Sequence, residues 1–159
     1  KDLIKFLKKF KTNTSFKIFN LILHHIYGPG DSKHKFTSRL IKLLNNEDYL
    51  DLTLGLQERD FIYITDACEA ISRIIKNNRK FEGTFIEKDI ATGDVITLKE
   101  FITACHRLLN SNSKLNFGKI PYRKGEIMSV KTDVKYLKEI GWKKEHDLNS
   151  GIKKMINLN

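Results

Sequence analysis

The segment Gly55–Asp66 reads GLQERDFIYITD, and it decides the fold. A polar turn led by glycine runs into a short apolar strand over 61–64. A helix is predicted to start at Thr65, directly after that strand. Arg59 and Asp60 stand at the mouth of the strand, where side chains can meet an anionic ligand. A strand that feeds straight into a helix is typical of an α/β protein.

The same alternation of strands and helices runs through the rest of the chain, which we interpret as one α/β domain over 1–159. Further strands are predicted over 16–23, 50–54, 83–91 and 115–120, and the residues His24–Asp31 are predicted to form a loop. Helices are predicted over 1–11, 36–44, 65–76, 97–109, 133–140 and 147–156. Two of them begin with capping-box spacing, Asp66 with Glu69 and Thr97 with Glu100. Trp142, after Gly141, is expected in the core.

Composition narrows the class of protein. Of 159 residues 40% are hydrophobic, and no apolar run approaches the roughly 20 residues that span a bilayer. The chain opens Lys-Asp with no apolar leader, so no membrane contact and a cytoplasmic location are expected. Cys68 and Cys105 are predicted to be buried free thiols in a reducing compartment, and no metal site is predicted. The net charge of +10 is spread over the chain, which favours a solvated lysine face and no nucleic-acid partner.

Motifs in five places and in one order carry a family resemblance. They are Tyr27-Gly28-Pro29, Lys35-Phe36, Gly55 with Arg59-Asp60, Arg123-x-Gly125-Glu126, and Leu137-x-x-Ile140-Gly141-Trp142. Together they resemble the C-terminal, substrate-binding portion of an NAD-dependent sugar-nucleotide epimerase/dehydratase of the extended short-chain dehydrogenase/reductase type. The resemblance implies a few strands of a Rossmann sheet plus a small mixed α/β substrate-binding domain.

In that family the N-terminal half is a dinucleotide-binding Rossmann domain with a Gly-rich turn and a catalytic Tyr-x-x-x-Lys pair. The nine glycines here never fall in the required spacing. Lys1 aligns with either the catalytic Lys or the residue after it, and the Tyr is absent in both alignments. We therefore expect a fragment that does not catalyse alone. NAD or NADP would serve the full-length enzyme and would not bind this part tightly.

Arg59 is the first candidate for substrate binding, because the family uses this residue to hold the diphosphate and a guanidinium fork suits phosphate oxygens. A structural pairing with Asp60 or Glu58 is the alternative. Arg123 aligns with a second arginine that contacts the diphosphate or the ribose. Asp60 is expected to be structural, bonding backbone amides around the start of the strand.

His25 aligns with the family's substrate-contacting Asn, and Ile22 with an Arg, so the chain departs from the pattern at both positions. A histidine can donate to a sugar or phosphate oxygen as Asn does, but it titrates near neutrality. The resemblance also places His24 and His25 beside the cofactor, Lys35 near the diphosphate, and Phe36 and Leu52 near the base. The alternatives are loop histidines satisfied by the backbone, a core Phe36 at a helix start with a solvated Lys35, and an ordinary amphipathic strand around Leu52.

The resemblance implies the nucleotide-sugar-binding half of an NAD(P)-dependent nucleoside-diphosphate-sugar epimerase or dehydratase. In the full enzyme, the sugar would pass through a transient keto form. Such enzymes commonly serve bacterial polysaccharide synthesis and dimerise through the helix that corresponds to 1–11, so apolar surface on Leu3, Leu7 and Phe10 is expected. A non-catalytic basic binding module and a degenerate regulatory paralogue are the alternatives.

Overall fold

The structure, a computed structural model, describes residues 2–10 and 16–157. Its helices are α1 (Asp2–Phe10), α2 (Phe36–Asn46), α3 (Ile64–Lys76), the 3-10 turn η2 (Asn78–Lys80), α4 (Leu98–Leu108), α5 (Lys135–Glu139) and α6 (Leu148–Asn157). Its strands are β1 (Ile18–Leu23), β2 (His25–Tyr27), β3 (Tyr49–Leu52), β4 (Glu58–Tyr63), β5 (Phe85–Ile90), β6 (Val95–Thr97) and β7 (Lys114–Phe117). The predicted α/β class is confirmed. None of the described helices is long and apolar enough to cross a bilayer.

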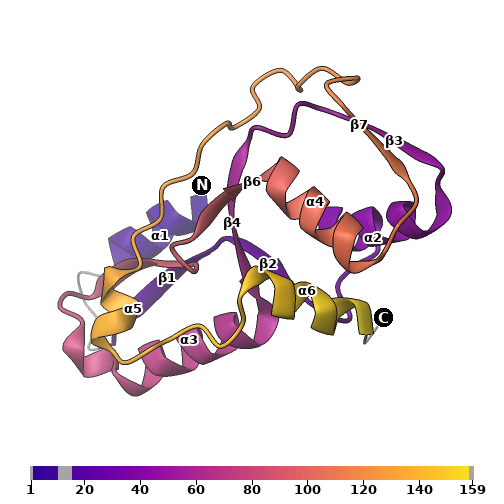
Figure 1. The fold of residues 1–159 in the computed structure, drawn as a ribbon. Helices are drawn as coiled ribbons and strands as arrows, with labels where there is room; N and C mark the ends of the chain where they lie inside the picture. Colours follow the sequence, from indigo (N-terminus) through magenta and orange to yellow (C-terminus); the bar gives the residue numbers. More distant parts are fainter. Residues whose placement is uncertain (1, 11–15, 158–159) are drawn as a thin grey trace.

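The strands form three small sheets (Figure 1). β1 pairs with β5 in parallel, and β3 pairs with β7 in parallel. The sheet between them places β4 at its centre, parallel to β2 and antiparallel to β6. A long connection leaves β7 and crosses the molecule to α5 (Figure 1), passing the start of β4 on its way.

β4 contributes to two hydrophobic cores because successive side chains of a strand point to opposite faces. Phe61 and Tyr63 belong to a core shared with α2, α4 and α6, where the rings of Phe61 and Phe101 stack at 3.9 Å. Ile62, fully buried, belongs to a second core with α3, β5 and α5. Trp142 is buried in that second core, as predicted. Residues 58–63 therefore form the structural centre from which the site is positioned.

Local sequence rules explain several element boundaries. Thr97 caps α4: its hydroxyl accepts from the Glu100 N–H, and the Glu100 carboxylate accepts from the Thr97 N–H, which confirms the predicted capping box. Gly141 has φ +79°, a left-handed conformation that ends α5 and turns Trp142 inward. Gly151 of α6 lies against the Tyr27 hydroxyl, where a side chain would collide.

The structure corrects other predictions. The predicted loop His24–Asp31 contains strand β2, because β4 offers it a parallel partner. The capping box of Asp66 with Glu69 is wrong: no side chain caps α3, and Asp66 bonds His146 instead. Strand β6 is an element that no pattern predicted. Cys105 is buried as expected, but Cys68 is exposed on α3.

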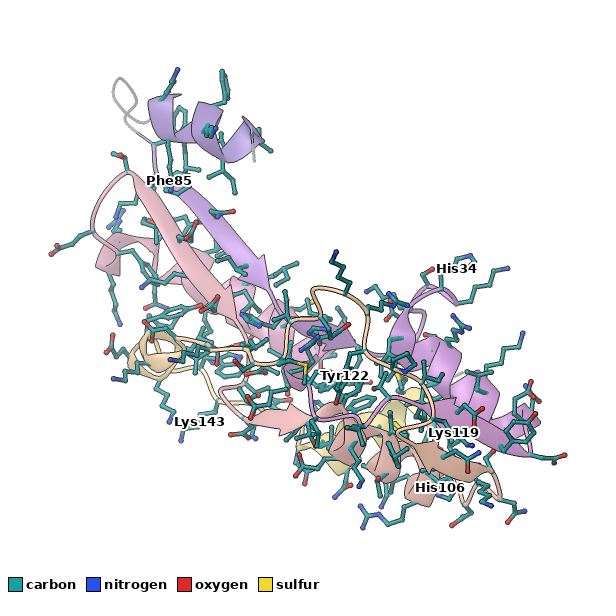
Figure 2. The ribbon with its side chains drawn as sticks, turned by 90° about the horizontal axis from the view of Figure 1, so that it is seen from above. His34, Phe85, His106, Lys119, Tyr122 and Lys143 are labelled. Carbon is teal, nitrogen blue, oxygen red and sulfur yellow. The ribbon has the colours of Figure 1, made fainter. Side chains whose placement is uncertain are left out.

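α1 lies at one end of the molecule, near Phe85 (Figure 2). The Lys8 ammonium sits 5.2 Å from the centre of the Phe85 ring. Leu3 is 67% exposed, in line with the expected apolar surface on this helix, whereas Leu7 is half-buried. The Phe10 side chain and Lys1, the catalytic candidate, lie outside the described residues.

Candidate functional site

Arg59, the second residue of β4, is held on several sides. Its Nη1 donates to the carbonyl oxygens of Glu58 and Ile127, each at 2.7 Å. Its Nη2 donates to Oε1 of Glu126 at 2.8 Å, forming an ion pair. Only 12% of the Arg59 side chain is exposed. Of the structural partners considered for Arg59, Glu58 contributes its backbone carbonyl, whereas the carboxylate that pairs with Arg59 belongs to Glu126 of the long β7–α5 connection.

That connection runs beside the start of β4 over 122–128, which we call the 122–128 segment. The Leu56 N–H donates to the Tyr122 hydroxyl at 3.1 Å, and the Glu58 N–H donates to the Met128 carbonyl at 2.7 Å. Figure 2 labels Tyr122 near the middle of the molecule. Both segments that the sequence singled out for diphosphate binding thus lie side by side.

Arg123 occupies the exposed part of the 122–128 segment. The Glu126 N–H donates to the Arg123 carbonyl at 3.1 Å, which closes a tight turn. Gly125 adopts φ +77° within it, a conformation that side-chain-bearing residues rarely take. The turn explains the Arg-x-Gly-Glu spacing: it leaves Arg123 in solvent and brings Glu126 back to Arg59.

Asp60 is fully buried next to Arg59 and has a structural role, as predicted. Its Oδ1 accepts from the N–H and the hydroxyl of Thr92, both at 2.8 Å, and its Oδ2 accepts from the Gly93 N–H at 2.8 Å. The Thr132 hydroxyl lies 3.4 Å from Oδ2. Asp60 therefore fixes the position of β4 against the turn that follows β5.

Four candidates from two places in the chain, His24 with His25 and Lys35 with Phe36, line one cavity. This cavity of about 490 Å³ is lined by Leu23, His24, His25, Ile26, Lys35, Phe36 and Thr37. His24 is anchored at its edge by a 3.1 Å contact between its Nε2 and Asp89 Oδ1. Lys35 pairs with Asp31 at 2.9 Å, and Phe36 is 40% exposed. The histidines and the Lys-Phe pair are therefore brought together as neighbours.

His25 lies at the surface, with one side of its ring against Phe61 at a centroid distance of 5.5 Å. The pKa of His25 is lowered from its usual value, first by desolvation and then by Coulombic interactions with Arg59 and His24, while the interaction with Asp60 acts in the opposite direction. At neutral pH the imidazole is therefore uncharged, with one nitrogen that donates and one that accepts.

Leu52 lies elsewhere: it is half-buried on β3, in register with Phe117 of β7, and does not line this cavity. Gln57, two residues before Arg59, is 5% exposed, and its Oε1 has no hydrogen-bond partner among the described residues. Sequence reasoning did not single out Gln57. A polar residue in a Gly-led turn gives no sign that its side chain will be buried.

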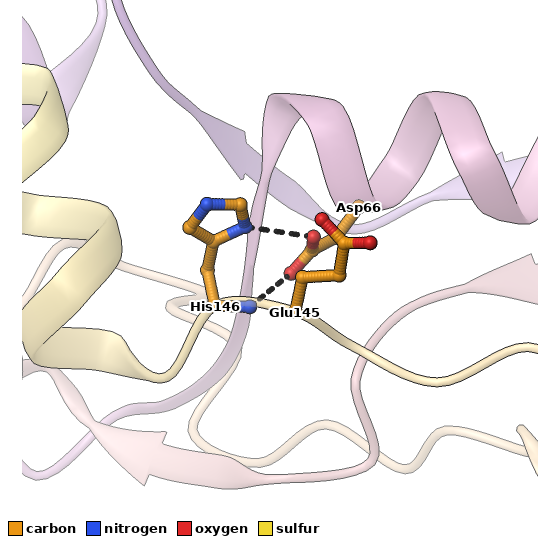
Figure 3. Close-up of side chains that lie close together, drawn as sticks. All are labelled: Asp66, Glu145 and His146. Carbon is orange, nitrogen blue, oxygen red and sulfur yellow. Dashed lines mark hydrogen bonds and ion pairs between the residues drawn. The ribbon is translucent and has the colours of Figure 1, made fainter.

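A second polar cluster, which the sequence did not indicate, joins α3 to the connection before α6 (Figure 3). Asp66, Glu145 and His146 place possible metal-ligand atoms within 4.8 Å of one another. Asp66 and His146 are already satisfied: His146 Nδ1 contacts Asp66 Oδ1 at 2.8 Å, and the His146 N–H donates to Oδ2 at 3.0 Å. Lys154 Nζ, a donor only, lies 2.7 Å from His146 Nε2. The imidazole therefore holds its proton on Nδ1, and the cluster is a structural link.

The described residues do not offer a cradle for a dinucleotide. The nearest match to a Gly-x-Gly-x-x-Gly turn begins at Gly28 and Gly30, and Lys33 stands where the third glycine would lie. No described helix follows such a turn directly. The chain's own residues therefore do not fit the diphosphate of NAD.

Comparisons with known proteins identify the family. The model of the NAD dependent epimerase/dehydratase family matches residues 3–86. A CDP-abequose synthase of Salmonella muenchen is 34% identical over 139 residues, covering 87% of this chain and 47% of that protein. A putative UDP-glucose 4-epimerase of Methanocaldococcus jannaschii is 29% identical, covering 73% of this chain and 35% of that protein. The chain thus spans about half the length or less of these curated relatives.

Solved structures share the fold. A UDP-glucose 4-epimerase of Thermotoga maritima, solved with UDP-glucose, superposes with a TM-score of 0.82 at 18% identity, covering 97% of this chain and 49% of that one. MoeE5, solved with UDP-glucuronic acid and NAD, gives 0.79 at 21% identity, covering 94% and 50%.

Proposed function

The chain belongs to the NAD-dependent epimerase/dehydratase family, and on that premise we propose that it supplies the nucleotide-sugar-binding half of a nucleoside-diphosphate-sugar epimerase, dehydratase or reductase. In the full-length enzyme, the sugar would pass through a transient keto form, and the cofactor would be NAD or NADP. This chain would hold and orient the substrate, a contribution of positioning rather than bond chemistry.

The contact between the start of β4 and the 122–128 segment carries the proposal. It sets Arg59 in a partly covered position and leaves Arg123 exposed in the adjoining turn. A fixed guanidinium that meets phosphate oxygens in a poorly solvated place binds them more strongly than a mobile surface cation does. We assign Arg59 to the diphosphate and Arg123 to the diphosphate or the ribose.

The cavity that contains His25 is the proposed place for the sugar. A neutral imidazole can donate to one hydroxyl and accept from another, which suits an uncharged sugar ring. Lys35 and Phe36 extend the same wall toward the nucleotide, although Asp31 shares the charge of Lys35. Leu52 remains the proposed contact for the base. A CDP-linked sugar is the first ligand to test, because the relatives at 34% and 36% identity are CDP-abequose synthases.

Calorimetric titration of the chain with CDP-linked and UDP-linked sugars tests the proposal. We expect saturable binding that depends on the base, and Arg59→Met should weaken it at least about tenfold. Arg79→Met is the matched control: Arg79 is exposed on η2, so the same charge is lost without loss of binding.

The rival function, a basic module for RNA or another polyanion, rests on the net charge of +10. Competition experiments with heparin and single-stranded RNA distinguish a polyanion-binding module from a nucleotide-sugar site. Binding that falls steeply with salt, and that polyanions displace while nucleotide sugars do not, would refute the proposed site.

A further inference from the structure

Arg59 has more hydrogen-bond donors than its present contacts use. A guanidinium carries five N–H donors. Both hydrogens of Nη1 and one of Nη2 are directed to Glu58, Ile127 and Glu126. The Nε–H and the second Nη2–H have no partner within the described part of the chain. Two donors therefore remain available in a side chain that the other three contacts hold still.

We infer that Glu126 is a positioning residue: its carboxylate holds the Arg59 guanidinium in the orientation in which the two remaining donors bind a diphosphate. The inference rests on the proposed function, which it deepens. Glu126 touches no substrate in this account and acts only through Arg59.

The geometry supports positioning because the contact is anchored from the backbone. Glu126 is held by the turn through Arg123, and the neighbouring Ile127 carbonyl accepts from the same guanidinium. The Glu126 side chain is 22% exposed, so water competes poorly for the ion pair. A free arginine side chain loses conformational freedom when a ligand immobilises it. Glu126 removes that loss before the ligand arrives.

If Glu126 only neutralised the charge of Arg59, removing it would change the ligand affinity in the opposite direction, so a Glu126 variant tests the inference. A carboxylate that merely neutralises Arg59 would compete with the anionic ligand, and its removal would tighten binding. A carboxylate that positions Arg59 weakens binding when it is removed, even though the protein becomes more positive.

The experiment is a titration of the chain with inorganic pyrophosphate and with a nucleoside diphosphate. Glu126→Ala should weaken both by about threefold to tenfold. Glu126→Gln keeps an oxygen acceptor for Nη2 and should retain most of the affinity. Glu82→Ala is the charge-matched control: Glu82 is exposed between η2 and β5, so the same charge is lost and affinity should be unchanged.

A second readout follows Arg59 itself. Its side-chain N–H resonances, assigned by their loss in Arg59→Met, should be resolved in the wild type and in Glu126→Gln and averaged in Glu126→Ala. The variants should have equal melting temperatures, which would show that the changes in affinity and in the N–H resonances do not come from unfolding.

The outcomes separate the two proposals. If the wild type binds and Glu126→Ala binds equally well or more tightly, the positioning role is overturned and the proposed site stands. If the wild type binds neither pyrophosphate nor a nucleoside diphosphate, the proposed function fails and the positioning role fails with it.

Discussion

Asp60 accepts hydrogen bonds from both the N–H and the hydroxyl of Thr92, and a third from the Gly93 N–H, so the turn after β5, and not the adjacent Arg59, satisfies this buried carboxylate. The distinction separates the roles of two neighbours in sequence. Side chains at consecutive strand positions point to opposite faces. Asp60 therefore holds β4 in the fold, and Arg59 remains directed toward the 122–128 segment.

Replacing Asp60 tests this division. Asp60→Ala should lower the free energy of unfolding by about 3 kcal/mol, because it leaves the N–H groups of Thr92 and Gly93 without an acceptor. Urea denaturation measures the change. Asp94→Ala is the control: it breaks only the exposed contact of Asp94 with Lys144 and should cost less than about 1 kcal/mol. Equal losses in the two variants would contradict the account.

The link between Asp66 and His146 should stabilise α6 against α3. Asp66→Ala leaves the buried His146 N–H and Nδ1–H unpaired, so we expect a loss of about 2–4 kcal/mol in the free energy of unfolding. Glu145→Ala should change it by no more than about 0.5 kcal/mol, since Glu145 is exposed. A Glu145 variant as unstable as the Asp66 variant would show that the three side chains act as one unit.

The pKa of His25 should lie below its usual 6.5, as measured from its ring carbon and proton shifts in NMR spectra. Arg59→Met should raise this pKa, because one of the positive neighbours that lower it is removed. Because the pKa of His25 is lower in the folded chain than in the unfolded chain, the unfolded chain takes up the proton first as pH falls. His25 therefore lowers the free energy of unfolding as pH drops from above 6.5 toward the folded pKa. A His25 pKa above 6.5 would show that desolvation does not dominate.

The cap of α4 gives a prediction that needs no knowledge of function. Thr97→Ala should cost about 1 kcal/mol of stability. Hydrogen bonds from the Thr97 side chain, and then from its backbone, lower the pKa of Glu100, so the variant should raise it. The stability that this contact contributes is present above the unfolded pKa of Glu100 and is lost as pH falls through the folded pKa. Thr103→Ala, exposed in the middle of α4, should be neutral.

Local chemistry made much of the fold predictable from the sequence. The Thr97–Glu100 spacing located α4, and the short apolar run that begins at Phe61 located β4, because both signals act between near neighbours. Strand β2 was missed because its strand character depends on a partner far along the chain. A three-residue strand carries no periodic signal of its own.

The site was predictable in its residue types but not in its contacts. The sequence indicated Arg59 and the motif that contains Glu126, yet the two are 67 positions apart, and the pairing depends on the turn at Gly125. The link between Asp66 and His146 spans 80 positions and left no local pattern. Long-range ion pairs are set by topology, which single-sequence patterns do not encode.

The most direct test of the account maps where a nucleotide sugar binds. Backbone amide NMR shifts of the chain should be recorded during titration with a CDP-linked sugar. We predict the largest shifts in residues 55–59 and 122–128, with a second group around His25 and Phe36. Shifts confined to the lysines of α1, or to the link between Asp66 and His146, would contradict the claim that the start of β4 and the 122–128 segment form the diphosphate site.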